Sequence, residues 1–252
     1  MSLVSTEWLN KNLSKVKIID ASWHMPNTNR NAYDEYKKEH IKNAIFFDID
    51  KFSNKKTELP HMLPDEKEWE KIVSNLGITN EERIIVYDNS DVLSSCRCWY
   101  TFIFFGHKPN LISILNGGLS KWKKENRETT DKTSNHEKKN YKAKKILQLV
   151  KTKEEIDKNI SEKKFQVVDA RSKNRFLGLE KEPRPGVRSG SIKNSYCLPF
   201  GELINLEDKT FLEKNLIKEK FAKIGINKEN NVVFSCGSGI TAAVLSLAYS
   251  MI

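Results

Sequence analysis

The sequence predicts an α/β protein made of two copies of one domain, each a mainly parallel sheet flanked by helices. Two observations lead to this fold class. Three stretches of the first half recur in the second half, in the same order and at nearly equal spacing, which indicates a duplicated architecture. Within each half, short β-branched runs alternate with amphipathic stretches, which is typical of parallel strands connected by covering helices.

Three pairs of segments carry the repeat. They are Val16–Ala21 with Phe165–Ala170, His40–Asn43 with Ser191–Asn194, and Leu76–Asp88 with Ile224–Cys236. Amphipathic patterns at Asp65–Leu76 and Phe211–Ile224 predict equivalent helices in the two halves. A polar, glycine-free segment separates the copies, so we expect domains at 1–128 and 146–252 joined by an exposed linker at 129–145.

The second copy is predicted to be the shorter one. After Asp88 the first copy continues through a helix, the apolar strand Leu111–Leu115 and a helix that begins near Gly117. The chain ends at Ile252, soon after Cys236, so we expect the second domain to lack one strand and one helix. Because this would leave an open sheet edge and apolar surface, we interpret the sequence as a fragment that ends early.

Composition narrows the class of protein. Hydrophobic residues make up 38% of the chain and charged residues 30%. No apolar stretch approaches the roughly 20 residues of a membrane-spanning helix, and the N-terminus has no export signal. Four cysteines do not form a disulfide scaffold, so we expect a cytoplasmic protein. The net charge of +10 comes from scattered lysines without a nucleic-acid motif, so we expect neither a nucleic-acid nor a membrane partner.

Cys236 is the strongest candidate for a catalytic residue. It follows the apolar run Val232–Phe234 and precedes the Ala/Leu-rich stretch Ala242–Ala248, which predicts strand, tight turn and helix. Gly237 and Gly239 let the turn curl so that several N–H groups point inward. Together with the positive end of the helix dipole, these groups stabilise a thiolate and make it a better nucleophile.

The other cysteines are interpreted as structural. Cys96 and Cys98 are two residues apart on a predicted helix and point to nearly opposite faces, and Cys197 precedes an apolar run at a strand end. No second Cys or His pair completes a zinc site, and no glycine-rich nucleotide loop is present. We therefore expect no metal and no cofactor.

Motifs along the whole chain resemble those of one family. In the first copy they are Asp20–His24, Phe46–Asp50, His61–Pro64 and Asn116–Gly118; in the second they are Val168–Ser172, Arg175–Gly178, Glu182–Arg184 and Cys236–Ala242. On these residues the chain resembles the tandem-domain rhodanese sulfurtransferases, and within them the 3-mercaptopyruvate sulfurtransferases. It departs from the family where Ser191 replaces a usual histidine, where Cys96 replaces a common proline, and in its missing C-terminal strand and helix.

The resemblance implies roles for particular residues. Cys236 would take sulfur from a donor and hold it as a persulfide, Arg175 and Arg184 would bind the substrate, and Ser238 would join His61 and Asp50 in a proton relay. This relay would place the site between the domains. The remaining loop residues expected to touch substrate are Gly237, Gly239, Ile240 and Thr241. Each of these roles has an alternative. Arg175 and Arg184 could be solvated arginines on a loop, Ser238 could cap the following helix, and His61 could be a structural histidine.

The first copy is predicted to be catalytically silent, because Asp88 stands where the second copy has Cys236. Gly237 and Ser238 are uncharged, whereas thiosulfate-type relatives carry cations there, so a keto-acid donor is favoured. The residue six positions after Cys236 is Ala242, whereas the Cys-x5-Arg phosphatases need an arginine there to hold phosphate. The sequence therefore excludes a phosphatase of this class.

We therefore expect a 3-mercaptopyruvate sulfurtransferase that releases pyruvate and passes sulfur to cyanide or to a thiol acceptor, such as a thioredoxin-like protein. We also expect a monomer. The alternatives are a thiosulfate:cyanide sulfurtransferase and an inactive sulfur-carrier or interaction module. Donor kinetics separate the first alternative from this prediction, and persulfide formation separates the second.

Overall fold

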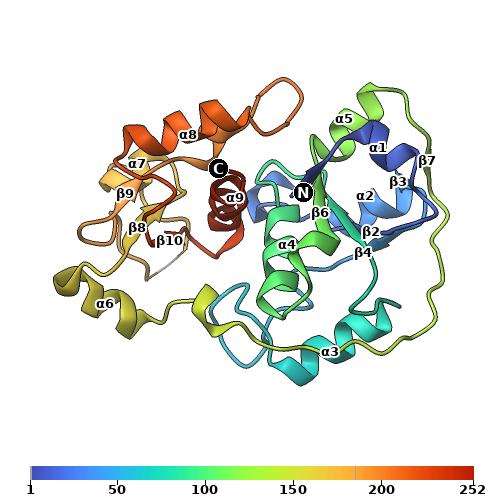
Figure 1. The fold of residues 1–252 in the computed structure, drawn as a ribbon, viewed down its shortest axis with the longest axis horizontal. Helices are drawn as coiled ribbons and strands as arrows, with labels where there is room; N and C mark the ends of the chain where they lie inside the picture. The colour runs from blue at the N-terminus through green and yellow to red at the C-terminus, as the bar shows by residue number, and fades with distance from the viewer. Residues whose placement is uncertain (1, 185) are drawn as a thin grey trace. The chain divides into compact units, whose positions relative to one another are not determined.

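The computed structural model describes residues 2–184 and 186–252 and divides the chain into two compact units (Figure 1). The first unit comprises Met1–Leu147 with Glu207–Thr210, and the second comprises Gln148–Leu206 with Phe211–Ile252. Each unit contains its own parallel sheet. No helix among the described residues has the length and apolar character needed to cross a membrane.

The sheet of the first unit is parallel throughout, in the order β1-β6-β5-β2-β4. Its strands are β1 (Leu3–Val4), β2 (Lys17–Asp20), β4 (Ala44–Phe46), β5 (Ile84–Tyr87) and β6 (Ile112–Leu115). Every residue of β5 is buried, because this apolar strand lies between β2 and β6 under helices on both faces. A separate antiparallel pair joins β3 (His40–Ile41) to β7 (Thr129–Thr130).

Helices cover both faces of this sheet (Figure 1). On one face lie α1 (Thr6–Asn10), α2 (Ala32–Lys38) and α5 (Gly118–Lys124), which contribute Leu9, Tyr36, Leu119 and Trp122 to the main apolar core. On the other lie α3 (Glu66–Asn75) and α4 (Ser95–Phe104), where Trp69 packs against Phe102 and Phe105. Short 3₁₀ turns occur at Pro26–Thr28, Pro109–Leu111, Leu147–Leu149 and Phe200–Leu203.

The second unit repeats the central part of this arrangement. Its strands β8 (Gln166–Asp169), β9 (Tyr196–Cys197) and β10 (Val232–Ser235) form a parallel sheet in the order β10-β8-β9, which matches β5-β2-β4. Its helices are α6 (Lys153–Glu162), α7 (Lys173–Leu177), α8 (Lys214–Lys223) and α9 (Ile240–Tyr249). The predicted fold class is therefore confirmed. The amphipathic stretch from Phe211 enters its helix only at Lys214, because Phe211 pairs with Ile204 in an isolated bridge.

Backbone conformation confirms the duplication at single positions. Asn43 and Asn194, equivalent in the repeat, both adopt left-handed conformations, with φ of 66° and 63°. Gly77 and Gly225, which follow α3 and α8, do the same at 68° and 77°. Glycine is favoured at such helix ends because it has no Cβ to clash in this conformation. Two independent matches of this kind indicate that the copies share local geometry as well as sequence.

The segment predicted as an exposed linker, 129–145, is exposed at most of its residues, yet it packs on one unit and does not stand apart from both. It belongs to the first compact unit, which extends to Leu147. Thr129 and Thr130 pair with β3, the Lys144 N–H donates to the Phe105 carbonyl, and Tyr141 is only 1% exposed. A polar segment can still pack in this way, because its backbone groups and a few apolar side chains find partners on the domain that it follows.

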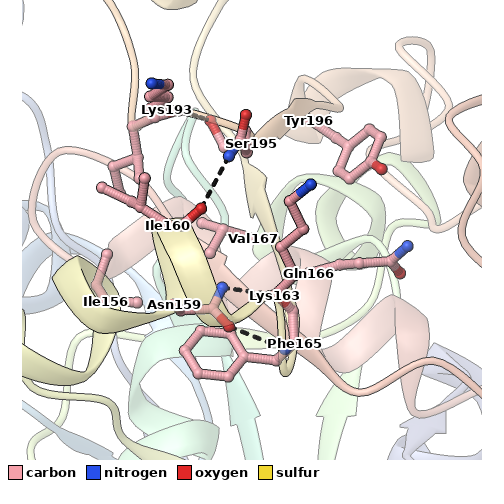
Figure 2. A pocket seen from close by; sticks show the side chains of 12 residues that line it. Ile156, Asn159, Ile160, Lys163, Phe165, Gln166, Val167, Lys193, Ser195 and Tyr196 are labelled. Carbon is pink, nitrogen blue, oxygen red and sulfur yellow. Dashed lines mark hydrogen bonds between the residues drawn. The ribbon is translucent and has the colours of Figure 1, made fainter.

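The second unit has an open face where the first has a core. In the first unit that face is filled by Leu119 and Trp122 of α5, and no counterpart of β6 or α5 occurs among the described residues of the second unit. A pocket of about 440 Å³ lies there instead, between α6 and β8 (Figure 2). Its lining includes Ile156, Ile160 and Val167. In the repeat, Val167 is equivalent to Ile18, which lies in the filled core of the first unit. An unfilled pocket at this position is expected for a shortened copy.

Candidate active site

Cys236 lies in the turn between β10 and α9. β10 ends at Ser235 and α9 begins at Ile240, so the thiol sits at the carboxyl end of a strand and before a helix, as predicted. The backbone N–H of Gly239 donates to Cys236 Sγ at 3.1 Å. Gly239 has φ of 81°, a conformation that other residues rarely adopt, and this allows the chain to fold back over the sulfur.

The other loop residues differ in how far they are exposed to solvent. Gly237 is exposed, and Ser238 and Thr241 are half-buried. Ile240 is only 3% exposed and its side chain belongs to the core, so it can meet a substrate only through its backbone in the first turn of α9. The apolar side of α9 is buried along its length, which anchors the loop to a rigid element.

Arg175 and Arg184 converge on the loop beside the cysteine. Arg175 comes from α7, whose N-cap Ser172 accepts a hydrogen bond from the Arg175 backbone at 3.3 Å. Arg184 Nη2 donates to the Gly237 carbonyl. A Cβ placed on Gly237 would lie 3.1 Å from Arg184 Nη2 and 3.3 Å from Arg175 Nη2. The missing side chain of Gly237 thus leaves room for two guanidinium groups, and the structure brings Cys236 and both predicted arginines together.

A chain of ion pairs holds Arg175 in place. Asp169, at the end of β8, pairs with Arg171 at 2.6 Å, and Arg171 reaches Glu182 at 2.7 Å. Glu182 also pairs with Arg175 at 2.6 Å. Hydrogen bonding by Arg175 lowers the pKa of Glu182, and hydrogen bonding to Asp169 raises the pKa of Arg171. The Arg171 side chain is buried within this network.

Glu182 begins the Glu182–Arg184 motif, and no role for it was predicted from the sequence. One signal could have found it, because it is an acidic residue on the short stretch between two candidate substrate arginines. An acid in that position can pair with one of them and fix its direction.

His61 and Asp50 form a hydrogen-bonded pair within the first unit. His61 Nε2 lies 2.9 Å from Asp50 Oδ1, and the Trp23 indole N–H donates to Asp50 Oδ2 at 2.9 Å. The hydrogen bond with His61 lowers the pKa of Asp50. His61 Nδ1 is buried without a partner among the described residues. The pair has the geometry of an oriented histidine, while its predicted connection to Ser238 stays a prediction.

The loop equivalent to Cys236 in the first unit is occupied by a carboxylate. Asp88 accepts the backbone N–H groups of Ser90 at 2.8 Å and Ser95 at 2.9 Å. Burial raises the pKa of Asp88. Arg30 donates to the Asn89 carbonyl at 3.0 Å, which parallels the contact of Arg184 with Gly237. The loop of the first unit thus retains inward N–H groups, which already bind Asp88, and its lack of thiol chemistry stays a prediction.

The remaining cysteines have the surroundings of structural residues. Cys96 and Cys98 are completely buried in α4, and burial raises the pKa of both thiols. Cys197 is half-buried at the end of β9, where partial burial raises the pKa of its thiol. Within residues 2–184 and 186–252, no group of three or more His, Cys, Asp or Glu side chains is arranged to hold a metal ion.

Comparison with known proteins identifies the family of this chain. The Rhodanese-like domain profile matches residues 5–125 and 152–251. Thiosulfate/3-mercaptopyruvate sulfurtransferase 1, mitochondrial, from Arabidopsis thaliana is 35% identical over 97% of this chain and 70% of its own length. The 3-mercaptopyruvate sulfurtransferase of Mus musculus is 36% identical over 96% of this chain and 83% of its own.

A solved structure agrees in fold. The 3-mercaptopyruvate sulfotransferase SseA from Escherichia coli superposes with a TM-score of 0.90 at 29% identity, covering 100% of this chain and 94% of that one. Sequence, domain profile and three-dimensional fold lead to the same assignment. The chain belongs to the rhodanese family, as a sulfurtransferase with two rhodanese-like domains in tandem.

Proposed function

We propose that this sulfurtransferase takes sulfur from 3-mercaptopyruvate, carries it as a persulfide on Cys236 and passes it to a thiol acceptor or cyanide. The observation that supports this proposal best is the convergence of Arg175 and Arg184 on uncharged Gly237, next to the thiol. Two guanidinium forks suit a donor that offers a carboxylate and an adjacent carbonyl oxygen.

The proposed reaction has two steps, formation of the persulfide and transfer of its outer sulfur. The Cys236 thiolate attacks the donor sulfur, a sulfur–sulfur bond forms, and the carbon–sulfur bond breaks with its electron pair going to carbon. The resulting enolate takes up the proton released by the donor thiol, and pyruvate leaves. An acceptor thiolate or cyanide then attacks the outer sulfur and regenerates the Cys236 thiolate. The Gly239 N–H stabilises negative charge on the cysteine sulfur in both steps.

His61 and Asp50 have a role in the first of these steps. In the proposal, Ser238 and His61 move the proton between donor thiol and enolate, and Asp50 keeps the imidazole oriented. The 2.9 Å contact between His61 and Asp50 supports this assignment. Replacing Asp50 by Asn would keep its size while removing the charge, so the first step should slow more than the second.

Thiosulfate is the second candidate donor. One relative carries both donors in its name, so family membership leaves the choice open. Gly237 and Ser238 provide no cationic side chain for a dianion, which favours the keto acid. Values of kcat/KM for the two donors decide between them, and a strong preference for thiosulfate would overturn the choice of 3-mercaptopyruvate.

Mass spectrometry tests persulfide formation directly. The intact protein treated with 3-mercaptopyruvate should gain the mass of one sulfur atom, and the gain should disappear in Cys236→Ser. Cys197→Ser is the matched control, because this thiol lies in the same unit outside the loop. It should retain the gain. No gain in the wild-type protein would instead support an inactive carrier or interaction module.

A further inference from the structure

Glu182 is the centre of the charged network beside the thiol loop. Its side chain is only 4% exposed. It accepts two parallel hydrogen bonds from Arg175, with Nε at 3.0 Å from Oε1 and Nη2 at 2.6 Å from Oε2. A third comes from Arg171 Nη1, at 2.7 Å. A two-bonded carboxylate–guanidinium pair fixes the plane of the arginine as well as its distance.

This arrangement leaves Arg175 able to bind a second anion. A guanidinium has five N–H donors, and the pair with Glu182 uses the Nε donor and one donor on Nη2. The same Nη2 lies beside Gly237. Glu182 therefore holds one edge of Arg175, while the second donor on Nη2 and both donors on Nη1 take no part in this pair.

The network also sets the charge that a donor meets. Asp169, Arg171, Glu182 and Arg175 alternate in sign, and their formal charges cancel. Arg184 contacts the Gly237 carbonyl and forms no ion pair with a carboxylate of the described residues. The five side chains together carry one net positive charge next to Cys236.

We propose that Glu182 is a positioning residue that also determines donor specificity: it orients Arg175 and cancels its charge, so that the site favours a donor with one negative charge over a dianion. The inference rests on the proposed function of the Cys236 site. 3-Mercaptopyruvate carries one carboxylate, whereas thiosulfate carries two charges. An additional uncompensated guanidinium would strengthen the attraction for the dianion more than for the monoanion.

The test compares donors in charge-altered variants. In Glu182→Gln, the ratio of kcat/KM for thiosulfate to that for 3-mercaptopyruvate should rise by about tenfold, because one compensating charge is lost. In Glu182→Asp, the charge remains but the carboxylate is shorter. KM for 3-mercaptopyruvate should then rise while the donor ratio stays within about twofold of the wild type.

Glu180→Gln is the matched control. Glu180 lies on the same loop and is exposed, so its substitution removes an equal charge away from the guanidinium pair. The donor ratio should remain unchanged in this variant. A Glu182→Gln enzyme in which both donors lose activity equally would show that Glu182 only supports the fold, and the proposal would be wrong.

A measurement on the wild type covers the case in which Glu182→Gln does not fold. Pyruvate, a monoanion, should compete with 3-mercaptopyruvate more tightly than sulfate, a dianion, and equal or tighter inhibition by sulfate would overturn the charge argument. The persulfide assay separates the two levels of inference. If the wild type forms no persulfide with either donor, the proposed function fails and the role of Glu182 falls with it. If persulfide forms and the donor ratio does not respond, only the role of Glu182 fails.

Discussion

At the scale of single residues, the site depends on the space and the backbone N–H groups that its glycines make available. Gly237 leaves space for Arg175 and Arg184, and Gly239 allows the turn that brings an N–H group to Cys236. The sequence predicted the cysteine, both glycines and both arginines as site residues. It could not predict which arginine is paired, because that depends on the distance from Glu182 in the folded chain.

Arg184→Ala is expected to raise KM for 3-mercaptopyruvate and leave kcat less affected. Loss of a charge-assisted hydrogen bond costs about 1.5–3 kcal/mol, equivalent to roughly 10- to 100-fold. Steady-state kinetics measure both constants. Arg188→Ala is the control, because the Arg188 guanidinium donates to the carbonyls of Ser189 and Ser191 on its own loop. An unchanged KM in Arg184→Ala would remove Arg184 from the substrate site.

A buried carboxyl makes the first unit sensitive to pH. Complete burial raises the pKa of Asp20 from 3.8 to about 6, against hydrogen bonds from Ser22 that lower it. A raised pKa favours the protonated acid in the folded state. The contribution of this group to stability is therefore present below pH 3.8 and is lost as the pH rises to about 6.

The prediction is that Asp20→Asn removes this pH dependence. The free energy of unfolding of the wild type, relative to the variant, should fall by on the order of 3 kcal/mol across this range. Asparagine can still accept the Ser22 hydrogen bonds through its oxygen. Urea unfolding at several pH values measures this difference. Carboxyls with lowered pKa values change the free energy of unfolding in the opposite direction, but they do so in both proteins and therefore cancel in the comparison. A constant difference across the range would contradict the assignment.

At the scale of elements, local sequence signals predicted the strands and helices that matter to the site. Asp65 caps α3, and its side chain accepts the Glu68 backbone N–H, as the amphipathic pattern from Asp65 suggested. The expected helix from Phe211 began late because a bridge between Phe211 and Ile204 competes with helix formation. Capping and periodicity act over a few residues, whereas the bridge depends on tertiary contact.

Gly77→Ala and Gly225→Ala form a matched pair that the duplication supplies. Both glycines have left-handed backbone, so alanine should cost about 1–2 kcal/mol at each position. At Gly225 nothing lies within 4 Å of the added methyl group. At Gly77 the methyl group would lie 2.8 Å from the Glu137 carbonyl oxygen, which should cost about 1–3 kcal/mol more.

Urea unfolding measures the two effects separately. All five tryptophans lie within Met1–Leu147, so tryptophan fluorescence follows the first unit, and far-UV circular dichroism also includes the second. Gly77→Ala should lower the fluorescence midpoint more than Gly225→Ala lowers any midpoint. Equal effects would show that the 129–145 segment yields to the methyl group and is only loosely held on the first unit.

At the scale of the whole molecule, the two copies differ in how well their central strands are covered. β5 lies between two strands and is fully buried, whereas β10 is an edge strand whose residues are all half-buried. Less burial means less apolar surface removed from water, and therefore a smaller stabilisation of that sheet. The Cys236 loop follows the less covered strand.

Hydrogen exchange should therefore distinguish the copies. The amides of Val232–Ser235 should exchange faster than those of Ile84–Tyr87, by more than about tenfold, because exposed edge strands open at lower free energy. Exchange measured by mass spectrometry after peptic digestion resolves both strands. Equal protection of the two strands would show that the second sheet is as stable as the first despite its open edge.

The sequence by itself determined the duplicated α/β fold and the strand–turn–helix around Cys236. These features depend on periodicity, glycine positions and chain order, which act locally and can be seen in the order of residues. Only the tertiary structure decided that Glu182 holds Arg175, that His61 pairs with Asp50, and that the 129–145 segment packs on the first unit. The physical reason is that hydrogen bonds and packing depend on side-chain distances and directions, which exist only after the whole chain has folded.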